Sequence, residues 1–344
     1  MKTEVVSVDP ERPAAEILAR AGEVLRRGGL VAFPTETVYG LGANALDGEA
    51  VQRIFTAKGR PATNPLIVHV ATIEQATTVA ESWPEKAQVV AARFWPGPLS
   101  LVLKKRSEVP DIVTAGGETV ALRSPAHAVA QGLIRAAGVP VAAPSANLST
   151  RISPTRAEHV LRWLDGRIDM LLDGGPTSGG LESSVIDLTV SPPRLLRPGL
   201  VSPHEIEAAI GPIAVGPKTP AANSRPGQSA VARSPGLAAR HYAPTTPLEC
   251  RSDSWPYVSQ LCQAGLHVGW LVLKLPPFET SAGLIAVELS DDPAEYAANL
   301  YAALHRLEAL ALDRIVVELP PDHEAWLAVR DRLQRAATAD QKIG

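Results

Sequence analysis

The chain has 344 residues, which is more than one ordinary core needs and suits two domains. Hydrophobic residues make up 45% of it but aromatic residues only 4%, so its cores must be built from Ala, Val, Leu and Ile. The formal net charge of -3 is far from the basic composition that tight nucleic-acid binding requires. No apolar run approaches the roughly 20 residues of a membrane-spanning helix, and the first residues lack a signal-peptide pattern. We therefore expect a soluble, cytoplasmic protein with no membrane contact.

The first 210 residues alternate helical and strand-like patterns. Residues 14–27 place apolar side chains on one helix face and end at two glycines, which is a helix C-cap signal. Short apolar runs then follow at residues 30–33, 66–70, 99–103, 120–122, 139–143 and 185–188. Helical patterns lie between several of these runs, so residues 1–210 are predicted to form an α/β sheet domain.

Residues 211–247 contain seven prolines and four glycines and have no sustained apolar period. This composition predicts a linker over residues 211–246. Beyond it, strand-like runs at 267–273, 284–289 and 315–319 alternate with helices, the clearest at 293–310. The last part, residues 247–344, is predicted to be a small Rossmann-like α/β domain.

Acidic residues are concentrated in that last part of the chain. Residues 246–344 hold 8 Lys and Arg against 14 Asp and Glu, which leaves 25 against 22 for residues 1–245. Chemistry on anionic ligands is therefore expected in the first domain, on small ligands rather than on a long nucleic acid.

Two polar segments flank predicted strands early in the chain. The sequence FPTETVYGLG (33–42) follows a strand, where polar groups usually face a crevice, although a capped turn at the start of a helix is the alternative. In KGRPATNPLIVHV (58–70), Lys58 and Arg60 lie on a loop stiffened by Pro and Gly, which suits phosphate or carboxylate, although a solvated basic turn would look the same. His69, inside an apolar strand, is by default a core histidine.

Further polar groups follow later strands. Arg123 ends the strand TVALR, and APSANLS (143–149) follows the next one, with Ser-Pro-Thr (153–155) expected to start a helix. Hydroxyl and amide groups near a helix N-terminus are ready donors for an anion. Four polar strand ends in one sheet domain predict a common crevice. The glycine-rich stretch 173–180 lacks the Gly-Lys-Ser/Thr ending of a nucleotide-binding P-loop, so we interpret it as a flexible loop.

Taken together, these segments resemble the threonylcarbamoyl-AMP synthase family, which has the YrdC-type fold. The resemblance runs from about residue 14 to residue 210 and rests on FPTETVYGLG, KGRPATNPLIVHV, FWPGPLSLVL, TVALR, APSANLS, SPT, SSVIDLT and LLRPG in that order. The segment SPGLAARHYAP (234–244) and the α/β tail look like the longer, two-domain form of the family. Ser100 and Ser184 stand where the family usually has threonine, and both keep a hydroxyl.

The resemblance implies an open, twisted α/β sheet whose positively lined concave surface is the active site. It implies that threonine is bound by Thr37, His69 and Arg123, with Ser183 or Ser184 nearby. It assigns ATP and its Mg²⁺ to Lys58, Arg60, Asn64, Thr119, Ser145, Asn147, Ser153 and Arg197. The linker is expected to act as a lid that brings Ser234 and Tyr242 toward the nucleotide.

The reaction implied is synthesis of threonylcarbamoyl-AMP from L-threonine, bicarbonate and ATP with release of pyrophosphate. Lys58 and Arg60 are expected to neutralise the polyphosphate, and Ser145 and Asn147 to help hold the metal. The product would pass to a tRNA threonylcarbamoyl-transferase complex for modification of the adenosine beside the anticodon, with at most transient RNA contact. No nucleophile motif is present, which agrees with a reaction driven by positioning and electrostatics.

Two other functions fit parts of the sequence. A concave basic surface could hold an RNA duplex without catalysis, in which case affinity would fall steeply with salt. A carbamoyl transferase acting on carbamoyl phosphate uses a similar fold, but it would require acylphosphatase-like and zinc-finger segments that the chain lacks.

Overall fold

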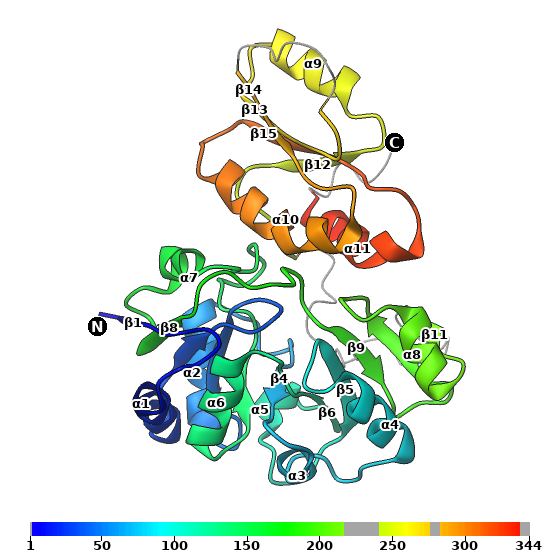
Figure 1. The fold of residues 1–344 in the computed structure, drawn as a ribbon. Helices are drawn as coiled ribbons and strands as arrows, with labels where there is room; N and C mark the ends of the chain where they lie inside the picture. Colours follow the sequence, from blue (N-terminus) through cyan, green and yellow to red (C-terminus); the bar gives the residue numbers. More distant parts are fainter. Residues whose placement is uncertain (1, 217–240, 276–282, 338–344) are drawn as a thin grey trace.

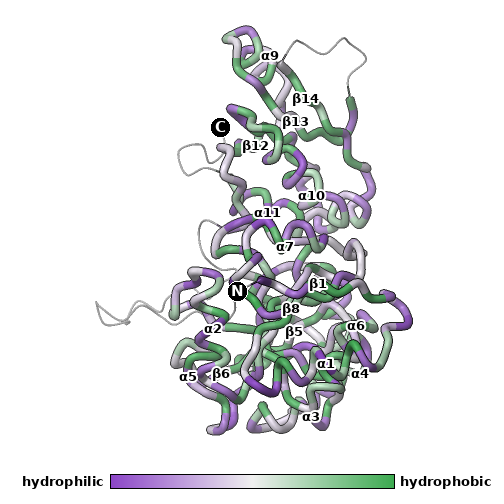
Figure 2. Tube along the Cα trace, turned by 90° about the vertical axis from the view of Figure 1, so that its left-hand side faces the viewer, coloured by the Kyte–Doolittle hydropathy of each residue, from purple (hydrophilic) through white to green (hydrophobic). Residues whose placement is uncertain are grey.

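The computed structural model describes residues 2–216, 241–275 and 283–337. These residues form two α/β units, each built on one β-sheet, with the second unit above the first in Figure 1. Apolar residues are frequent in the strands of both sheets, and polar residues gather in the outer turns (Figure 2). The predicted fold class, an α/β sheet domain followed by a smaller one, is confirmed. None of the described helices combines the length and apolar character that crossing a bilayer needs.

The first unit contains an eleven-stranded sheet of mixed direction. Its strands, in spatial order, are β1 (Glu4–Ser7), β8 (Met170–Asp173), β2 (Val31–Phe33), β3 (Gly40–Asn44), β7 (Val141–Ala142), β4 (Ile67–His69), β6 (Thr119–Arg123), β5 (Leu99–Lys104), β9 (Ser184–Asp187), β10 (Arg194–Arg197) and β11 (Ala214–Val215). The parallel pair β4–β6 places His69 directly beside Arg123. Strand β5 is antiparallel to β6, and β9 is antiparallel to β10. The first residues of β5 and β9 therefore lie at the same edge of the sheet as the last residues of β4, β6 and β10.

Helices cover the two faces of this sheet unequally. One face packs against α2 (Gly48–Lys58), α3 (Ile73–Thr77), α4 (Glu85–Phe94), α5 (Asp111–Thr114), α7 (Ala157–Leu164) and α8 (Pro203–Ile210). On the other face, α1 (Ala15–Arg26) and α6 (Ala128–Ala137) cover β1, β8, β2 and β7. Beyond them, over β4, β6, β5, β9 and β10, that face carries a cluster of only five buried apolar side chains among the described residues. The thin packing leaves room for a site on this part of the sheet.

The second unit has a four-stranded, fully parallel sheet in the order β12 (Leu248–Arg251), β15 (Arg314–Glu318), β13 (Val268–Val272) and β14 (Leu284–Glu288). The helices α10 (Pro293–Glu308) and α11 (Leu327–Ala336) lie between this sheet and the first unit, with the short helix η1 (Glu324–Trp326) before α11 (Figure 1). Helix α9 (Trp255–Gln263) packs on the far face. A parallel sheet with helices on both faces is the arrangement expected of a Rossmann-like unit.

The two units share a hydrophobic core. Val38, Ile152 and Leu181 of the first unit belong to the same buried cluster as Leu300 and other residues of α10 and α11. At this contact Gly180 has φ +70, and a Cβ on it would lie 2.3 Å from the carbonyl oxygen of Ala297. The glycine-rich stretch interpreted as a flexible loop therefore ends in a close backbone contact with α10.

The structure decides one alternative that the sequence left open, corrects one interpretation and adds one strand. The segment 33–42 does not open a helix but turns into β3, which pairs with β2 in antiparallel fashion. Residues 153–155 do not start a helix, because α7 begins at Ala157 with Arg156 as its N-cap. The first residues of the predicted linker form the edge strand β11, parallel to β10. Most of that linker lies outside the described residues, so its limits at 211 and 246 stay predictions.

Candidate active site

A buried, positively charged cavity lies on the thinly packed part of the first sheet. The residues that line it include Thr37, Arg60, His69, Arg123, Ser145, Ser183, Arg197 and Tyr242. They come from segments next to β2, β4, β6, β7, β9 and β10, and from the end of the predicted linker. The predicted convergence of polar strand ends is therefore present, although the cavity also extends over the sheet face to Ile67.

Arg123 is held from three sides at the end of β6. Its Nη1 donates a hydrogen bond to Thr37 Oγ1 (2.9 Å) and its Nε donates to the carbonyl oxygen of Gly97 (3.2 Å). Its Nη2 forms an ion pair with Glu36 Oε1 at 2.7 Å, and Glu36 was not among the predicted site residues. The guanidinium thus already binds one carboxylate, which is the chemistry needed to bind the carboxylate of an amino acid.

His69 lies beside Arg123 and is 3% exposed. Burial, and then the charge of Arg123, lower the pKa of His69 to about 3, so the ring is neutral at physiological pH. Its Nδ1 is buried and has no hydrogen-bond partner in the part of the chain that the structure describes. His69 was by default a core residue, but it lines the cavity with an unused ring nitrogen.

Arg60 and Arg197 supply the other two guanidinium groups. Arg60 donates from Nε to the carbonyl oxygen of Asn64 (3.0 Å) and from Nη2 to that of Pro65 (2.7 Å). Arg197 donates from Nε and Nη2 to the carbonyl oxygen of Ser183 (3.1 and 2.9 Å). Burial lowers the pKa of Arg60 to about 10, which still leaves it charged at neutral pH. Backbone carbonyls orient both guanidinium groups, as a rigid anion site requires.

Lys58 lies behind the cavity and does not line it. Its Nζ donates to the carbonyl oxygens of Ser145 (2.5 Å) and Asn147, and it is 2% exposed. Burial and the neighbouring Arg60 lower the pKa of Lys58 well below its ordinary value. In this arrangement Lys58 fixes the loop 145–147, and direct contact with a polyphosphate would require its ammonium group to turn toward the cavity.

The loop after β7 contributes one polar side chain to the cavity. Ser145 lines it, and its hydroxyl donates to Asn147 Oδ1 at 2.6 Å. Asn147 is 1% exposed and does not line the cavity, because its amide nitrogen donates to the carbonyl oxygens of Leu148 and Arg151. Asn147 therefore shapes the loop that presents Ser145.

The two neighbouring serines before and at the start of β9 differ in position. Ser183 lines the cavity, and its hydroxyl lies 2.8 Å from that of Ser100. Ser184 is fully buried and bonds instead to the backbone of Val201, because successive residues of a strand point to opposite faces. Ser153 is also fully buried and donates to Glu182 Oε1 at 2.5 Å. Among these serines, Ser183 is the one that lines the cavity.

Besides Lys58, Asn147 and Ser153, two more predicted ATP ligands do not line the cavity, and another cannot be placed. Thr119 begins β6, so it lies four residues and about 13 Å along the strand from Arg123. Asn64 contributes its backbone carbonyl to Arg60, and its side chain does not line the cavity. Ser234 falls outside the described residues. The roles of these residues stay predictions, and the observed geometry does not support that of Thr119.

Tyr242, which was assigned to the nucleotide, lines the cavity together with two residues, Glu182 and His241, that were not predicted from the sequence. Glu182 is buried and lines the cavity directly before Ser183. His241 and Tyr242, at the end of the linker, line it too, and the Tyr242 hydroxyl is buried with no hydrogen-bond partner among the described residues. A carboxylate followed by the motif SSVIDLT was the available signal for Glu182.

The cavity is small as it stands. It holds about 50 Å³ of free space, room for about four water molecules at the roughly 10–15 Å³ that each needs on this measure. Pockets for drug-sized ligands hold about 300–1,000 Å³. A nucleotide can enter only if part of the lining moves, and His241 and Tyr242 are the lining residues next to the linker.

Two family models match the chain in sequence. The first, described as "Telomere recombination" and covering the Sua5, YciO and YrdC proteins, matches residues 23–199. The second, described as "Threonylcarbamoyl-AMP synthase, C-terminal domain", matches residues 201–338. Together they span the second sheet and all strands of the first sheet except β1.

Individual proteins match over nearly the whole chain. The threonylcarbamoyl-AMP synthase of Pyrococcus abyssi is 44% identical over 92% of this chain and 93% of its own length. That of Bacillus subtilis is 45% identical over 93% of this chain and 92% of its own length. The crystal structure of Pyrococcus abyssi Sua5 complexed with L-threonine superimposes with a TM-score of 0.88 at 43% identity, covering 97% of this chain and 98% of that one.

Proposed function

The chain belongs to the threonylcarbamoyl-AMP synthase family, and we propose that it makes threonylcarbamoyl-AMP from L-threonine, bicarbonate and ATP. It is thus an enzyme of the nucleotidyltransferase type. The observation that carries the proposal is the convergence of Arg60, Arg123 and Arg197 on one buried cavity. Every substrate carries negative charge, and fixed cations in a water-poor site offset the repulsion between them.

The reaction proceeds in two steps. The threonine amine first attacks carbon dioxide or bicarbonate and forms a carbamate, with water released when bicarbonate is used. A carbamate oxygen then attacks the α-phosphorus of ATP, and the bond to the β-phosphate oxygen breaks to release pyrophosphate. Neither step needs a protein nucleophile, so positioning and charge are the contributions expected of the chain.

The two substrates are assigned to opposite ends of the cavity. Arg123, with Thr37 and His69 beside it, binds the threonine carboxylate in the manner of the Glu36 ion pair. A relative of similar fold was crystallised with L-threonine, which supports an amino-acid site in this family. Arg60 and Arg197 bind the phosphates at the other end.

Magnesium is proposed to enter with ATP. Among the described residues no three His, Cys, Asp or Glu side chains are grouped as a metal site, and Mg²⁺ is commonly held by substrate phosphates with few protein ligands. Of the two residues assigned to the ion, Ser145 lines the cavity and its hydroxyl fits such an ion. The amide oxygen of Asn147 does not fit it in this arrangement, because it accepts from Ser145 and lies 3.4 Å from the ammonium group of Lys58. When bound, the ion would neutralise phosphate charge.

The end of the linker is proposed to open and close the cavity. Tyr242 and His241 fill its nucleotide end, so they must move outward for ATP to enter and return to exclude water from the mixed anhydride. The product is then proposed to reach a tRNA threonylcarbamoyl-transferase complex in the cytoplasm, for modification of the adenosine beside the anticodon.

Mass spectrometry of the product tests this function. The purified chain is incubated with ATP, L-threonine, Mg²⁺ and carbon-13 bicarbonate, and released pyrophosphate is measured in parallel. We expect threonylcarbamoyl-AMP that carries the label, in amounts equal to the pyrophosphate, and neither product without threonine. Pyrophosphate release that is independent of threonine, or a product without the label, would contradict the proposal.

A further inference from the structure

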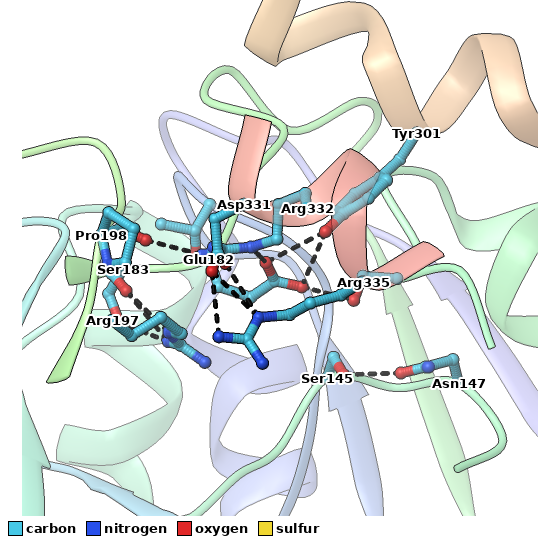
Figure 3. Close-up of polar contacts among 12 residues, drawn as sticks. Ser145, Asn147, Glu182, Ser183, Arg197, Pro198, Tyr301, Asp331, Arg332 and Arg335 are labelled. Atoms are coloured by element: carbon cyan, nitrogen blue, oxygen red, sulfur yellow. Dashed lines mark hydrogen bonds and ion pairs between the residues drawn. The ribbon is translucent and has the colours of Figure 1, made fainter. Parts of the chain in front are cut away.

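Glu182 joins the active-site cavity to the second unit. Its Oε1 accepts a hydrogen bond from Ser153 Oγ (2.5 Å), and its Oε2 accepts from the hydroxyl of Tyr301 on α10 (3.1 Å). Arg332 on α11 donates from Nε to the same Oε2 at 2.8 Å (Figure 3). A carboxylate that lines the cavity is therefore held by two helices of the other unit.

Arg332 makes further contacts that reach the cavity. Its Nη2 donates to the carbonyl oxygen of Pro198 (2.9 Å), the residue after Arg197, and its Nη1 pairs with Asp331 at 2.6 Å. Its guanidinium also lies 5.1 Å from the centre of the Tyr242 ring, a cation–π contact. The side chain of Arg332 is 0% exposed. Its three groups of contacts fix Glu182, the backbone after Arg197, and Tyr242.

The contact between Glu182 and Arg332 brings two opposite charges together in a buried environment. Burial favours the neutral form of Glu182, but the charges of Arg332 and Arg197 and the bond from Ser153 outweigh it and hold the pKa of this carboxyl below its ordinary value. A buried charge pair is costly to leave half made, because the remaining charge has no water to solvate it. The ionised form and the position of Glu182 therefore depend on Arg332, together with the bonds from Ser153 and Tyr301.

We infer that Arg332 is a positioning residue for the nucleotide end of the active site, through which the C-terminal unit shapes that end. Arg332 contacts Tyr242 directly, is linked to Ser153 through Glu182, and bonds to the carbonyl of Pro198, the residue after Arg197. Tyr242, Ser153 and Arg197 are all assigned to ATP. Among the described residues Arg332 has no such contact with Thr37, His69 or Arg123, which are assigned to threonine. The inference rests on the proposed function for those assignments. A change at Arg332 should therefore affect ATP more than threonine.

The test compares two arginine-to-lysine substitutions on the same helix. Arg332→Lys keeps the charge but cannot reproduce the planar fork that contacts Glu182, Asp331 and Pro198 together. Arg330→Lys is the matched control: Arg330 is also ion-paired and largely buried, but it pairs with the exposed Asp322 of its own unit. Steady-state KM for ATP and for threonine, kcat and thermal unfolding are measured for both variants and the parent.

For Arg332→Lys we expect the KM for ATP to rise about tenfold, the low end for residues that orient ligand-contacting groups, with a much smaller change for threonine. Arg330→Lys should match the parent in both constants. An Arg332→Lys protein that folds and has the parent KM for ATP, or equal increases for both substrates, would overturn the inference. A parent that makes no threonylcarbamoyl-AMP would instead refute the proposed function, so the two failures differ.

A second substitution tests the same inference if the Arg332→Lys protein does not fold. Tyr301→Phe removes one hydrogen bond to Glu182 and leaves the ring, which stacks on Tyr242 at 5.9 Å. We expect a smaller increase in the KM for ATP alone, because Glu182 keeps its bond to Arg332. An unchanged KM for ATP in the folded Tyr301→Phe protein would count against the inference.

Discussion

Different side chains of the cavity are assigned to different substrates. Arg123 belongs to the end assigned to threonine, while Arg60 and Arg197 belong to the end assigned to ATP. All three are guanidinium groups oriented by backbone or side-chain acceptors. This distribution predicts that substitutions will separate the two substrates kinetically.

Arg123→Lys tests the threonine end. A lysine keeps the positive charge but loses the fork that can hold a carboxylate with two hydrogen bonds. We expect the KM for threonine to rise at least about tenfold, equivalent to roughly 1.4 kcal/mol, with the KM for ATP little changed. Initial rates of pyrophosphate release against each substrate measure both constants.

The control for this substitution is Arg53→Lys. Arg53 is also ion-paired across the fold, to Asp169, but its side chain is 44% exposed and lies outside the cavity. Its kinetics should match those of the parent. If Arg123→Lys changes the KM for ATP as strongly as that for threonine, the assignment of Arg123 to the amino acid is wrong.

At the contact between the first unit and α10, Gly180 packs closely against the helix backbone. With φ +70 and the backbone of α10 against its Cα, any side chain is both strained and blocked by main-chain atoms that cannot turn aside. Gly180→Ala should therefore lower the melting temperature more than Gly59→Ala, where φ is +58 but no atom of the described residues lies within 4 Å of the added Cβ.

We expect Gly59→Ala to cost about 1 kcal/mol, the penalty of the left-handed backbone alone. Gly180→Ala should cost clearly more and should also make the segment between the units easier to cleave with a protease. Differential scanning calorimetry and limited proteolysis measure the two effects. Equal melting temperatures for the two variants would show that α10 does not pack against Gly180.

Helices α7 and α10 meet through two stacked imidazole rings. His159 and His305 have ring centres 3.8 Å apart. Burial lowers the pKa of His305 to about 4, and burial together with the charge of His305 lowers that of His159 to about 3. Arg156 and Arg162 face the same groove and oppose protonation further. Both rings are therefore neutral in the folded protein at neutral pH.

Stability should consequently fall as the pH is lowered. The unfolded histidines take up protons near pH 6.5, while the folded ones resist until about pH 3 to 4, so acid favours the unfolded chain throughout that interval. A fully buried histidine contributes at most about 1.4 kcal/mol per pH unit, and the more exposed His159 less. Urea midpoints at pH 7.5 and 5.5 measure the effect, and His305→Gln should reduce it. Equal midpoints at the two pH values would contradict this prediction.

For the whole molecule, apolar strands of the core could be predicted from the sequence, whereas strands of other composition could not. Buried strands such as β4 and β6 are short apolar runs and were predicted, because burial on both faces demands such a pattern. Strands with glycine or charged residues, such as β3 and β12, were missed, because they draw their stability from neighbours rather than from their own composition.

The site was predictable where a residue's place follows from its own strand. Arg123 and Ser145 reach the cavity because they end or follow buried strands. Contacts between residues far apart in the sequence could not be predicted in this way. Glu182 and Arg332 are 150 positions apart, and neither local sequence indicates that they form a pair. The hydrogen bonds from Lys58 to two backbone carbonyls could not be predicted either, because they depend on the path of a distant loop.

The central claim is that one cavity holds an amino acid and a nucleotide at the same time. A crystal structure of the full chain with L-threonine and a non-hydrolysable ATP analogue tests it most directly. We predict the threonine carboxylate on Arg123, the phosphates on Arg60 and Arg197, and Tyr242 displaced from its present position. Density for either ligand elsewhere, for example in the groove between α7 and α10, with this cavity unchanged, would contradict the account.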